Sequence, residues 1–278
     1  MSKLQLPLMW HGGKGAFNGK LAKWIISLMP AHSIYVEPFA GGLSVLLHKE
    51  VYQDTSEIVN DIYGELSNFW RVLATTPDRM LRELWGTPFS EVAWNEAEQR
   101  LADSDAVRRA TAFYIRIRQS RQGLGKGFAT MSKERLRGGM NEQANNYWSA
   151  IEGLPAIHYR LKRVVIMCQD FEQVIKTNDG YGTFFYLDPP YLHETRDSGT
   201  LDSYTHEMSE ADHVRLLDLC KGMDGCFLLS GYHSKLYDDY AKEYHWGIHE
   251  YTLPNNASSK KKKDLKTECL WSNFSRIL

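Results

Sequence analysis

The sequence is poor in the features that mark membrane, secreted or cysteine-rich proteins. Its four cysteines among 278 residues form no C-x-x-C pair, so a disulfide framework or a cysteine-rich metal module is not expected. No apolar run approaches the length of a membrane-spanning helix. The N-terminus lacks the long apolar core of a signal peptide. We therefore expect a globular intracellular protein that needs neither a membrane nor a metal.

An overall excess of positive charge is also absent. The formal net charge is −1, with 43% hydrophobic and 24% charged residues, which is ordinary for a globular protein. The charge is uneven, however. Residues 108–137 contain nine Lys or Arg against one acid, a local net of nine minus one, or +8. A basic block of this kind predicts contact with nucleic acid, and a merely solvated helix face is the alternative.

The glycine fingerprint G-x-G-x-x-G of phosphate-binding dinucleotide sites is missing as well. A strand expected at residues 33–39 instead runs into Glu37-Pro38-Phe39-Ala40-Gly41-Gly42, and a helix is expected at residues 43–50. A strand, a glycine turn and a helix bring the backbone close to a ligand at the helix N-terminus. Without the phosphate fingerprint, this turn favours a non-phosphorylated nucleoside.

An acid follows the next expected strand, at residues 57–60. Asp61 lies twenty residues after Gly41. In nucleoside-binding α/β units, an acid at this spacing binds ribose hydroxyls. Asp61 also precedes a helical stretch, so a helix N-cap is the alternative, and the two roles are compatible.

The most informative stretch is an apolar run that stops at an acid. Residues 183–187, Thr-Phe-Phe-Tyr-Leu, read as a buried strand, and Asp188-Pro189-Pro190-Tyr191 follows. The prolines end the strand because neither can donate to a sheet ladder. A carboxylate, rigid carbonyls and an aromatic ring at the carboxyl end of a strand suit a flat ring that carries an amine.

The rest of the chain divides into strand-rich and helix-rich segments. Further strands are expected at residues 163–168, 226–229, 246–252 and 267–271, and Ser209 with Asp212 predicts a capping box. Helical periodicity dominates residues 63–161, which are too many for one crossover. Ser90 there is an expected N-cap, and Arg137-Gly138-Gly139 marks a loop or a hairpin. Lys260 to Lys263 form a run that either touches phosphates or is only solvated.

In this order, the motifs resemble those of the Dam-type (alpha-group) DNA adenine-N6 methyltransferases, in which the glycine motif precedes the catalytic motif. The resemblance implies a Rossmann-like seven-stranded α/β methyltransferase sheet with an inserted, mainly helical target-recognition subdomain. Residues 1–62 and 162–278 would form the catalytic domain that binds S-adenosyl-L-methionine, and residues 63–161 the insertion. It also implies methyl transfer to the N6 amine of a flipped-out adenine in double-stranded DNA.

The same resemblance implies roles for individual residues. The catalytic motif is Asp188, Pro189, Pro190 and Tyr191. The cofactor-binding residues are Trp10, Lys14, Glu37, Pro38, Phe39, Ala40, Gly41, Gly42, Asp61, Asp170, Phe171 and Asp188. The DNA-binding residues are Arg116, Arg118, Arg121, Lys126, Lys133, Arg135 and Arg137.

The residues leave several alternatives open for the substrate and for the activity. The substrate can instead be RNA adenine or the N4 amine of cytosine in DNA, and a catalytically silent DNA-binding relative is a third reading. We expect a cytoplasmic protein encoded by a prokaryote or a phage. We expect a monomer in solution, with a dimer on DNA left open. The recognition sequence and the presence of a partner restriction endonuclease do not follow from the residues.

Overall fold

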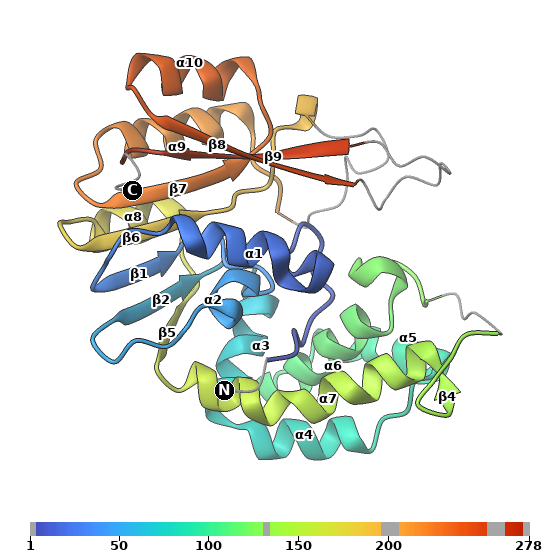
Figure 1. The fold of residues 1–278 in the computed structure, drawn as a ribbon. Helices are drawn as coiled ribbons and strands as arrows, with labels where there is room; N and C mark the ends of the chain where they lie inside the picture. The colour runs from blue at the N-terminus through green and yellow to red at the C-terminus, as the bar shows by residue number, and fades with distance from the viewer. Residues whose placement is uncertain (1–3, 130–133, 196–205, 255–264, 275–278) are drawn as a thin grey trace. The chain divides into compact units, whose positions relative to one another are not determined.

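The computed structural model describes residues 4–129, 134–195, 206–254 and 265–274. Seven strands form one sheet in the order β5-β2-β1-β6-β7-β9-β8 (Figure 1). In chain order, they are β1 (Ile34–Glu37), β2 (Ser56–Asn60), β5 (Val164–Met167), β6 (Thr183–Leu187), β7 (Cys226–Gly231), β8 (Gly247–Pro254) and β9 (Leu265–Ser272). Strand β1 is parallel to β2 and β6, β6 is parallel to β7, and β9 is antiparallel to β7 and β8. The predicted α/β class with a seven-stranded sheet is confirmed.

Helices account for most of the remaining described chain. They are α1 (Ala16–Leu28), α2 (Ser44–His48), α3 (Gly64–Thr75), α4 (Pro77–Trp85), α5 (Glu91–Arg100), α6 (Ala106–Arg118), α7 (Glu142–Leu161), α8 (Phe171–Asn178), α9 (Glu210–Lys221) and α10 (Lys235–Glu243). Two 3-10 turns lie at Arg121–Gly123 and His193–Thr195. Among the described helices, none has the length and apolarity that crossing a membrane requires.

The chain divides into two compact units. The first, which we call the helical unit, comprises residues 1–26, 40–51 and 63–168. The second, the sheet unit, comprises residues 27–39, 52–62 and 169–278. Helices α3 to α7 follow one another between β2 and β5 in the chain. The domain boundaries expected from the sequence, with residues 63–161 as the insertion, stay a prediction.

The sheet unit is built on strands that are buried along most or all of their length. All five residues of β6 are buried, and three of the four residues of β1 are buried. Central strands of parallel sheets are covered on both faces, so they read as continuous apolar runs rather than as alternating ones. This is why residues 183–187 were recognisable as a strand from the sequence.

The helical unit has an aromatic core of its own. The ring of Phe69 in α3 stacks on Tyr114 in α6 at 5.7 Å between centroids and contacts Phe113 at 6.0 Å. All three side chains are at most 2% exposed. Aromatic pairs at such distances add to the stabilisation that burial of their surface provides. The two helices therefore form the centre of this unit.

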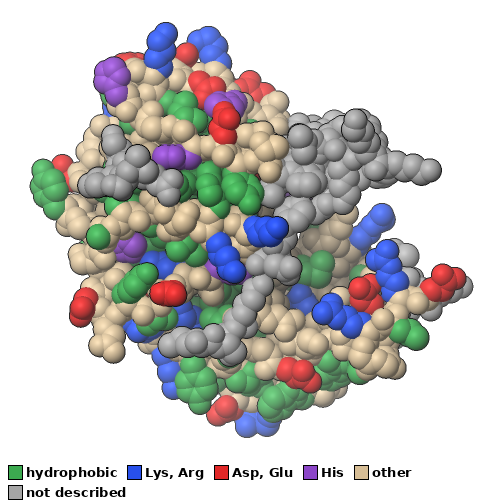
Figure 2. Space-filling view, viewed as in Figure 1, with side chains coloured by type: hydrophobic (Ala, Val, Ile, Leu, Met, Phe, Trp, Pro, Cys, Tyr) green, Lys and Arg blue, Asp and Glu red, His purple; other side chains and the backbone are tan. Residues whose placement is uncertain are grey.

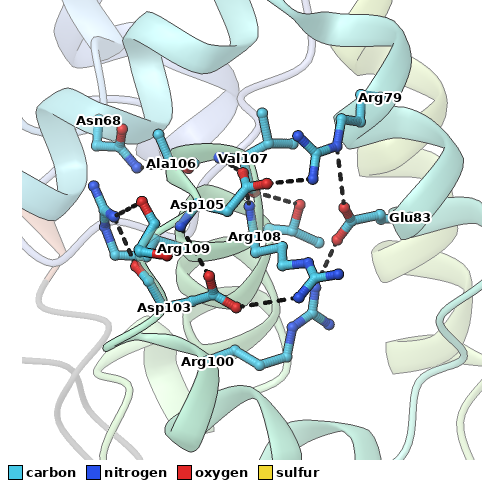
Figure 3. A network of polar contacts seen from close by, with 12 residues as sticks. Asn68, Arg79, Glu83, Arg100, Asp103, Asp105, Ala106, Val107, Arg108 and Arg109 are labelled. Atoms are coloured by element: carbon cyan, nitrogen blue, oxygen red, sulfur yellow. Dashed lines mark hydrogen bonds and ion pairs between the residues drawn. The ribbon is translucent and has the colours of Figure 1, made fainter.

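A polar network joins three helices of the helical unit (Figure 3). Asp105 caps α6 by accepting from the Val107 amide at 2.8 Å, and its carboxylate also pairs with Arg79 of α4. Arg79 holds the pKa of Asp105 below its usual range. Arg100 of α5 donates to Glu83 of α4 at 2.6 Å. The capping carboxylate thus fixes both the start of one helix and its place beside another.

Several local predictions about turns and caps are confirmed. Ser90 accepts a hydrogen bond from Ala93 as the N-cap of α5, and Ser209 with Asp212 forms the capping box of α9. The glycine pair at residues 138–139 joins β3 (Leu136–Arg137) to β4 (Met140–Asn141) as a hairpin. Both glycines have positive φ, which two-residue hairpin turns favour. The lysine run at residues 260–263 lies outside the described residues.

Candidate active site

The predicted catalytic motif follows β6 in the sheet unit. The strand is buried up to Leu187, and Asp188 is the first residue after it with a partly exposed side chain. Pro189 is buried, and Pro190 and Tyr191 are partly exposed. The motif therefore begins where the buried strand reaches solvent, at the carboxyl end where parallel α/β sheets bind ligands.

Three candidate residues follow neighbouring strands in matching register. Glu37 is paired with Val59, so Phe39 and Asp61 each come two residues after that pair. Val36 is paired with Phe185, so Phe39 and Asp188 each come three residues after that pair. Adjacent strands lie about 4.8 Å apart. Phe39, Asp61 and Asp188 thus leave the sheet at the same edge and at the same level.

The helix N-cap alternative for Asp61 is wrong. Helix α3 begins at Gly64, and Tyr63 occupies the cap position with no side-chain hydrogen bond. Asp61 itself is partly exposed at the end of β2. Asp61 is therefore not the N-cap residue of α3, and its ribose-binding role stays a prediction.

Glu37 is a buried carboxylate at the end of β1. Its side chain is 2% exposed, and its Oε1 accepts from the Tyr35 hydroxyl at 2.6 Å. Burial, followed by the nearby Glu37, raises the pKa of Tyr35 well above its usual range. A buried carboxylate needs such donors, because burial of an unpaired charge is costly. Tyr35 therefore holds Glu37 in place.

Asn60, which the sequence did not single out, ties three segments of the sheet edge together. Its Nδ2 donates to the Pro38 carbonyl at 2.9 Å and to the Gln169 carbonyl at 3.0 Å. Its Oδ1 accepts from the Gln169 amide at 2.8 Å. The side chain is 1% exposed. A buried amide with this set of partners fixes the turn at Pro38 next to the start of the segment that contains Asp170.

Asp170 and Phe171 form the N-terminus of α8. Asp170 caps the helix by accepting from the Glu172 amide at 2.9 Å, and its other oxygen pairs with Arg215 at 3.0 Å. Phe171 is 6% exposed, packs against Phe39 at 5.3 Å, and lies 4.4 Å below the Arg215 guanidinium. Both residues thus have structural roles, and Phe39, which is partly exposed, extends the aromatic surface towards the sheet edge.

In the helical unit, the glycine turn packs against Trp10. Gly41 has a φ of +47°, and a Cβ atom there would lie 2.6 Å from the indole nitrogen of Trp10. A Cβ atom on Gly42 would lie 2.7 Å from the Cβ atom of Trp10. Trp70 donates from its indole nitrogen to the Gly41 carbonyl at 3.1 Å. The two glycines therefore admit a tryptophan, a packing reason that the sequence did not predict.

The remaining cofactor candidates of this unit, Lys14 and Ala40, are buried. Lys14 is 4% exposed, and its Nζ donates to the Gly12 carbonyl at 3.2 Å. Ala40 is 7% exposed. A lysine is rarely this buried. Its ammonium group is therefore positioned by the surrounding backbone rather than freely solvated.

Tyr191 makes contacts with residues that the sequence did not indicate. Its ring meets Tyr232 edge to face, with centroids 4.8 Å apart and planes at 85°. Its hydroxyl oxygen lies 2.8 Å from Ser230 Oγ and donates to Glu268. Ser230 and Glu268 stand 39 and 77 residues further along the chain, so only the pairing of β6 with β7 and of β7 with β9 brings them together.

The predicted DNA-binding residues differ in their surroundings. Arg116 lies 3.3 Å over the ring of Trp94 and donates to the Gly125 carbonyl at 2.7 Å. Arg118 donates to the Asn146 carbonyl at 2.5 Å, and burial lowers the pKa of its guanidinium. Arg116 thus links α6 to α5 and to the loop at Gly125, and Arg118 links α6 to α7. The others that can be placed, Arg121, Lys126, Arg135 and Arg137, are exposed, and Lys133 lies outside the described residues.

Basic side chains on the surface lie near acidic ones. Figure 2 shows Lys and Arg side chains interspersed with acidic ones on the visible face. Arg135, for example, lies 3.8 Å from Glu142 and is 76% exposed. Exposed pairs of this kind contribute little to stability, so such an arginine can exchange its carboxylate for a phosphate.

One group of His, Cys and acidic donors in the described part of the chain is close enough to hold a cation: His233, Glu250 and Cys269. Both nitrogens of the His233 ring already face carboxylates. Nδ1 lies 2.9 Å from Asp238, and Nε2 lies 2.8 Å from Glu250. Glu250 and then Asp238 raise the pKa of His233. His233 therefore bridges two carboxylates, those of Asp238 and Glu250.

A mainly parallel seven-stranded sheet with acidic and aromatic residues at the carboxyl ends of β1, β2 and β6 defines a Rossmann-like methyltransferase class. The particular family is shown by comparison. The chain belongs to the D12 class N6 adenine-specific DNA methyltransferases, whose family model matches residues 10–253. The predicted family is thus confirmed, and with it the prediction that the chain is an enzyme of the adenine-specific DNA methyltransferase class.

Two curated relatives agree with this assignment. The Type II methyltransferase M.MjaIII of Methanocaldococcus jannaschii is 25% identical over 234 residues, which cover 78% of this chain and 79% of that protein. The Type II methyltransferase M.CviBI of Paramecium bursaria Chlorella virus NC1A is 23% identical over 252 residues, which cover 86% and 91%. The similarity therefore extends over most of each protein.

Proposed function

We propose that this chain transfers a methyl group from S-adenosyl-L-methionine to the N6 amine of a flipped-out adenine in duplex DNA. The single observation that carries the proposal is the position of Asp188-Pro189-Pro190-Tyr191. This motif directly follows the buried strand β6, level with Phe39 after the adjacent strand β1 and with Asp61 after β2, which lies next to β1. Membership in a family of adenine-specific DNA methyltransferases supports the same substrate atom.

The residues present fit a nucleoside cofactor. Asp61 is partly exposed at the end of β2, where its carboxylate suits ribose hydroxyls. The partly exposed ring of Phe39, backed by Phe171, suits the flat face of an adenine. Glu37, Pro38 and residues 40–42 would hold the methionine part, and Trp10 and Lys14 belong to the same predicted set of cofactor-binding residues. When bound, the cofactor supplies an electrophilic methyl group on a sulfonium.

The catalytic motif supplies hydrogen-bond acceptors to the amine. The N6 lone pair of adenine is delocalised into the ring, which makes the amine a poor nucleophile. The Asp188 carboxylate and the Pro189 carbonyl each accept one amine hydrogen. This pulls the nitrogen towards tetrahedral geometry and directs its lone pair at the methyl donor. The acceleration then comes from orientation and electrostatics.

Tyr191 provides the face on which the base is held. An adenine inside a duplex is inaccessible to Asp188, so it must leave the base stack. A tyrosine ring stabilises an extruded base by stacking, which is worth about 1–3 kcal/mol per base. The exposed cations Arg121, Lys126, Arg135 and Arg137 would contact the phosphates of the DNA. We also propose that the enzyme is cytoplasmic and encoded by a prokaryote or a phage.

Methyl transfer from radiolabelled S-adenosyl-L-methionine to duplex DNA tests the proposal. We expect Asp188→Ala to lower the transfer rate by at least about 100-fold, because an acceptor of the amine is lost. Cofactor affinity, measured by calorimetry, should fall much less than the transfer rate, because Asp188 is only one of the expected cofactor-binding residues. Asp224→Ala, which removes an exposed acid of the same unit, is the matched control and should transfer normally. A wild-type chain that binds the cofactor but methylates no duplex DNA contradicts the proposal, as does an active Asp188→Ala variant.

A further inference from the structure

The hydroxyl of Tyr191 is held by a buried carboxylate at the end of β9. Tyr191 and Ser230 both donate to Oε1 of Glu268, Ser230 at 2.9 Å, and the two hydroxyl oxygens lie 2.8 Å apart. Glu268 is 7% exposed and Ser230 is fully buried. A carboxylate out of water requires donors, and here hydroxyls of two other segments provide them.

The sheet explains why these side chains meet. Strand β9 is antiparallel to β7, with Ser230 opposite Leu270 and Gly231 opposite Cys269. Side chains alternate between the faces of a strand, so Glu268 lies on the same face as Leu270 and Ser230. Cys269 lies on the opposite face, next to His233 and Glu250. The pleat thus directs Glu268 specifically towards the segment that follows β6.

The contacts fix the ring of Tyr191 from two directions. The hydroxyl at one end is anchored by Glu268 and Ser230, and Tyr232 meets the ring edge to face at 4.8 Å. A hydrogen bond to an ionised acceptor is among the stronger ones in proteins. The ring is therefore oriented before any ligand arrives. Side-chain freedom that is already restricted does not have to be lost on binding.

We infer that Glu268 and Ser230 are positioning residues, which hold the ring of Tyr191 in the orientation that receives the target base. The inference rests on the proposed function, because it assigns Tyr191 to the base. Neither positioning residue touches the substrate. Each acts through the phenol oxygen of Tyr191, so its contribution disappears when that oxygen is removed.

A double-mutant cycle with Tyr191→Phe tests this dependence. Glu268→Leu and Tyr191→Phe should each lower kcat/KM for DNA by about 10- to 100-fold, as expected for a lost hydrogen bond to a charged group. Cofactor affinity should change less than about twofold, and the double variant should be no slower than Tyr191→Phe alone. Glu268→Gln keeps an acceptor and should recover most of the activity. Effects that multiply in the double variant, or wild-type kinetics of Glu268→Leu, overturn the inference.

A matched control lies on the neighbouring strand. Glu250→Gln removes a carboxylate from β8 on the opposite face of the sheet, and it should leave the DNA kinetics unchanged. If it slows methylation as much as Glu268→Leu does, the effect belongs to the sheet rather than to Tyr191, and the inference fails. If Glu268→Leu does not fold, Tyr191→Phe together with Ser230→Ala provides the same cycle.

A spectroscopic measurement separates this inference from the proposed function. 3-Fluorotyrosine incorporated at position 191 reports the environment of the phenol through its 19F chemical shift, with no need for activity. Glu268→Leu should move this signal, and Glu250→Gln should not. A wild-type chain that methylates no DNA overturns the proposed function. An unmoved 19F signal overturns the inference even when methylation is observed.

Discussion

At Gly41, a single backbone angle determines which residue the position accepts. The φ of +47° lies in the left-handed region, and the space above the Cα atom is taken by the indole of Trp10. Glycine adopts this conformation at no steric cost, whereas any other residue is strained there. The turn expected to hold the cofactor therefore needs glycine at this position for two reasons: the left-handed φ and the lack of a Cβ atom that would clash with Trp10.

We expect Gly41→Ala to lower the free energy of unfolding by about 1–3 kcal/mol, because the new methyl group adds backbone strain and a clash with Trp10. Cofactor affinity should fall with it. Denaturant unfolding and calorimetry measure the two effects. Gly64→Ala, at a glycine with nothing within 4 Å of the added Cβ atom, is the control and should leave both unchanged. Equal stability of Gly41→Ala and the wild type would contradict this account of the turn.

His233 predicts a pH dependence of stability. Hydrogen bonds to Glu250 and Asp238 raise its pKa above the ordinary value of 6.5. The folded state then binds its proton more tightly than the unfolded state does. The stabilisation is fully present below the ordinary pKa and is lost as the pH rises through the raised, folded-state pKa. His233 is 44% exposed, so solvent keeps the effect small, below about 1 kcal/mol.

Melting temperatures between about pH 5.5 and 9 test this expectation, since that range spans the ordinary histidine pKa. The difference between the wild type and His233→Gln should be largest at the acidic end and should shrink towards the alkaline end. An advantage of the wild type that grows with rising pH would show that the ring is neutral in the folded protein.

At the scale of whole elements, the candidate site is a set of strand ends held in register. Asn60 makes this possible at one corner, because its amide joins the end of β2 to the Pro38 turn and to Gln169. Sheet pairing alone fixes strands up to their last paired residues. The loops beyond them need side-chain hydrogen bonds of this kind to keep one conformation.

Asn60→Ala should destabilise the protein by about 2–4 kcal/mol, because it takes the partner from the buried Pro38 carbonyl and from the part-buried carbonyl and amide of Gln169. Asn178→Ala removes a single half-buried hydrogen bond to Val174 in the same unit and should cost about 1 kcal/mol or less. Urea unfolding of both variants gives the comparison. The account of this corner is wrong if the two variants are equally stable.

Some elements of the fold and some residues of the site were predictable from the sequence, and others were not. Strand β6 and its motif were predictable because a continuous apolar run and two prolines are local signals. Ser90 and Ser209 were predictable for the same reason. Helix α7 lies within residues 63–161, which were expected to be mainly helical, but its bounds were not predicted, because the internal Pro155 is a residue that usually ends a helix. Asn60, Ser230 and Glu268 were missed because their partners are distant in the chain.

At the scale of the whole molecule, affinity for DNA must come from a local excess of cations. The net charge of −1 gives no general attraction to a polyanion. Among the described residues of the basic segment, Arg121, Lys126, Arg135 and Arg137 have exposed side chains, and we predict that they contact phosphates. Arg116 and Arg118 were indistinguishable from them in the sequence, because burial is decided by tertiary packing.

This division predicts the salt dependence of DNA binding. Arg137→Gln should weaken binding and reduce the slope of log K against log salt concentration by about 1, because one phosphate contact is lost. Arg118→Gln should instead lower stability and leave the slope unchanged. Fluorescence anisotropy of a labelled duplex between low and moderate salt measures both. An unaltered slope in Arg137→Gln and in the corresponding variants of Arg121, Lys126 and Arg135 would place the DNA elsewhere.

In the proposed function, Asp188 directs an adenine amine towards a methyl donor. Mass analysis of nucleosides from the DNA of cells that express this chain tests it most directly. We expect N6-methyladenine with the wild-type chain and none above background with Asp188→Ala. N4-methylcytosine in place of N6-methyladenine, or equal N6-methyladenine from both chains, would contradict it.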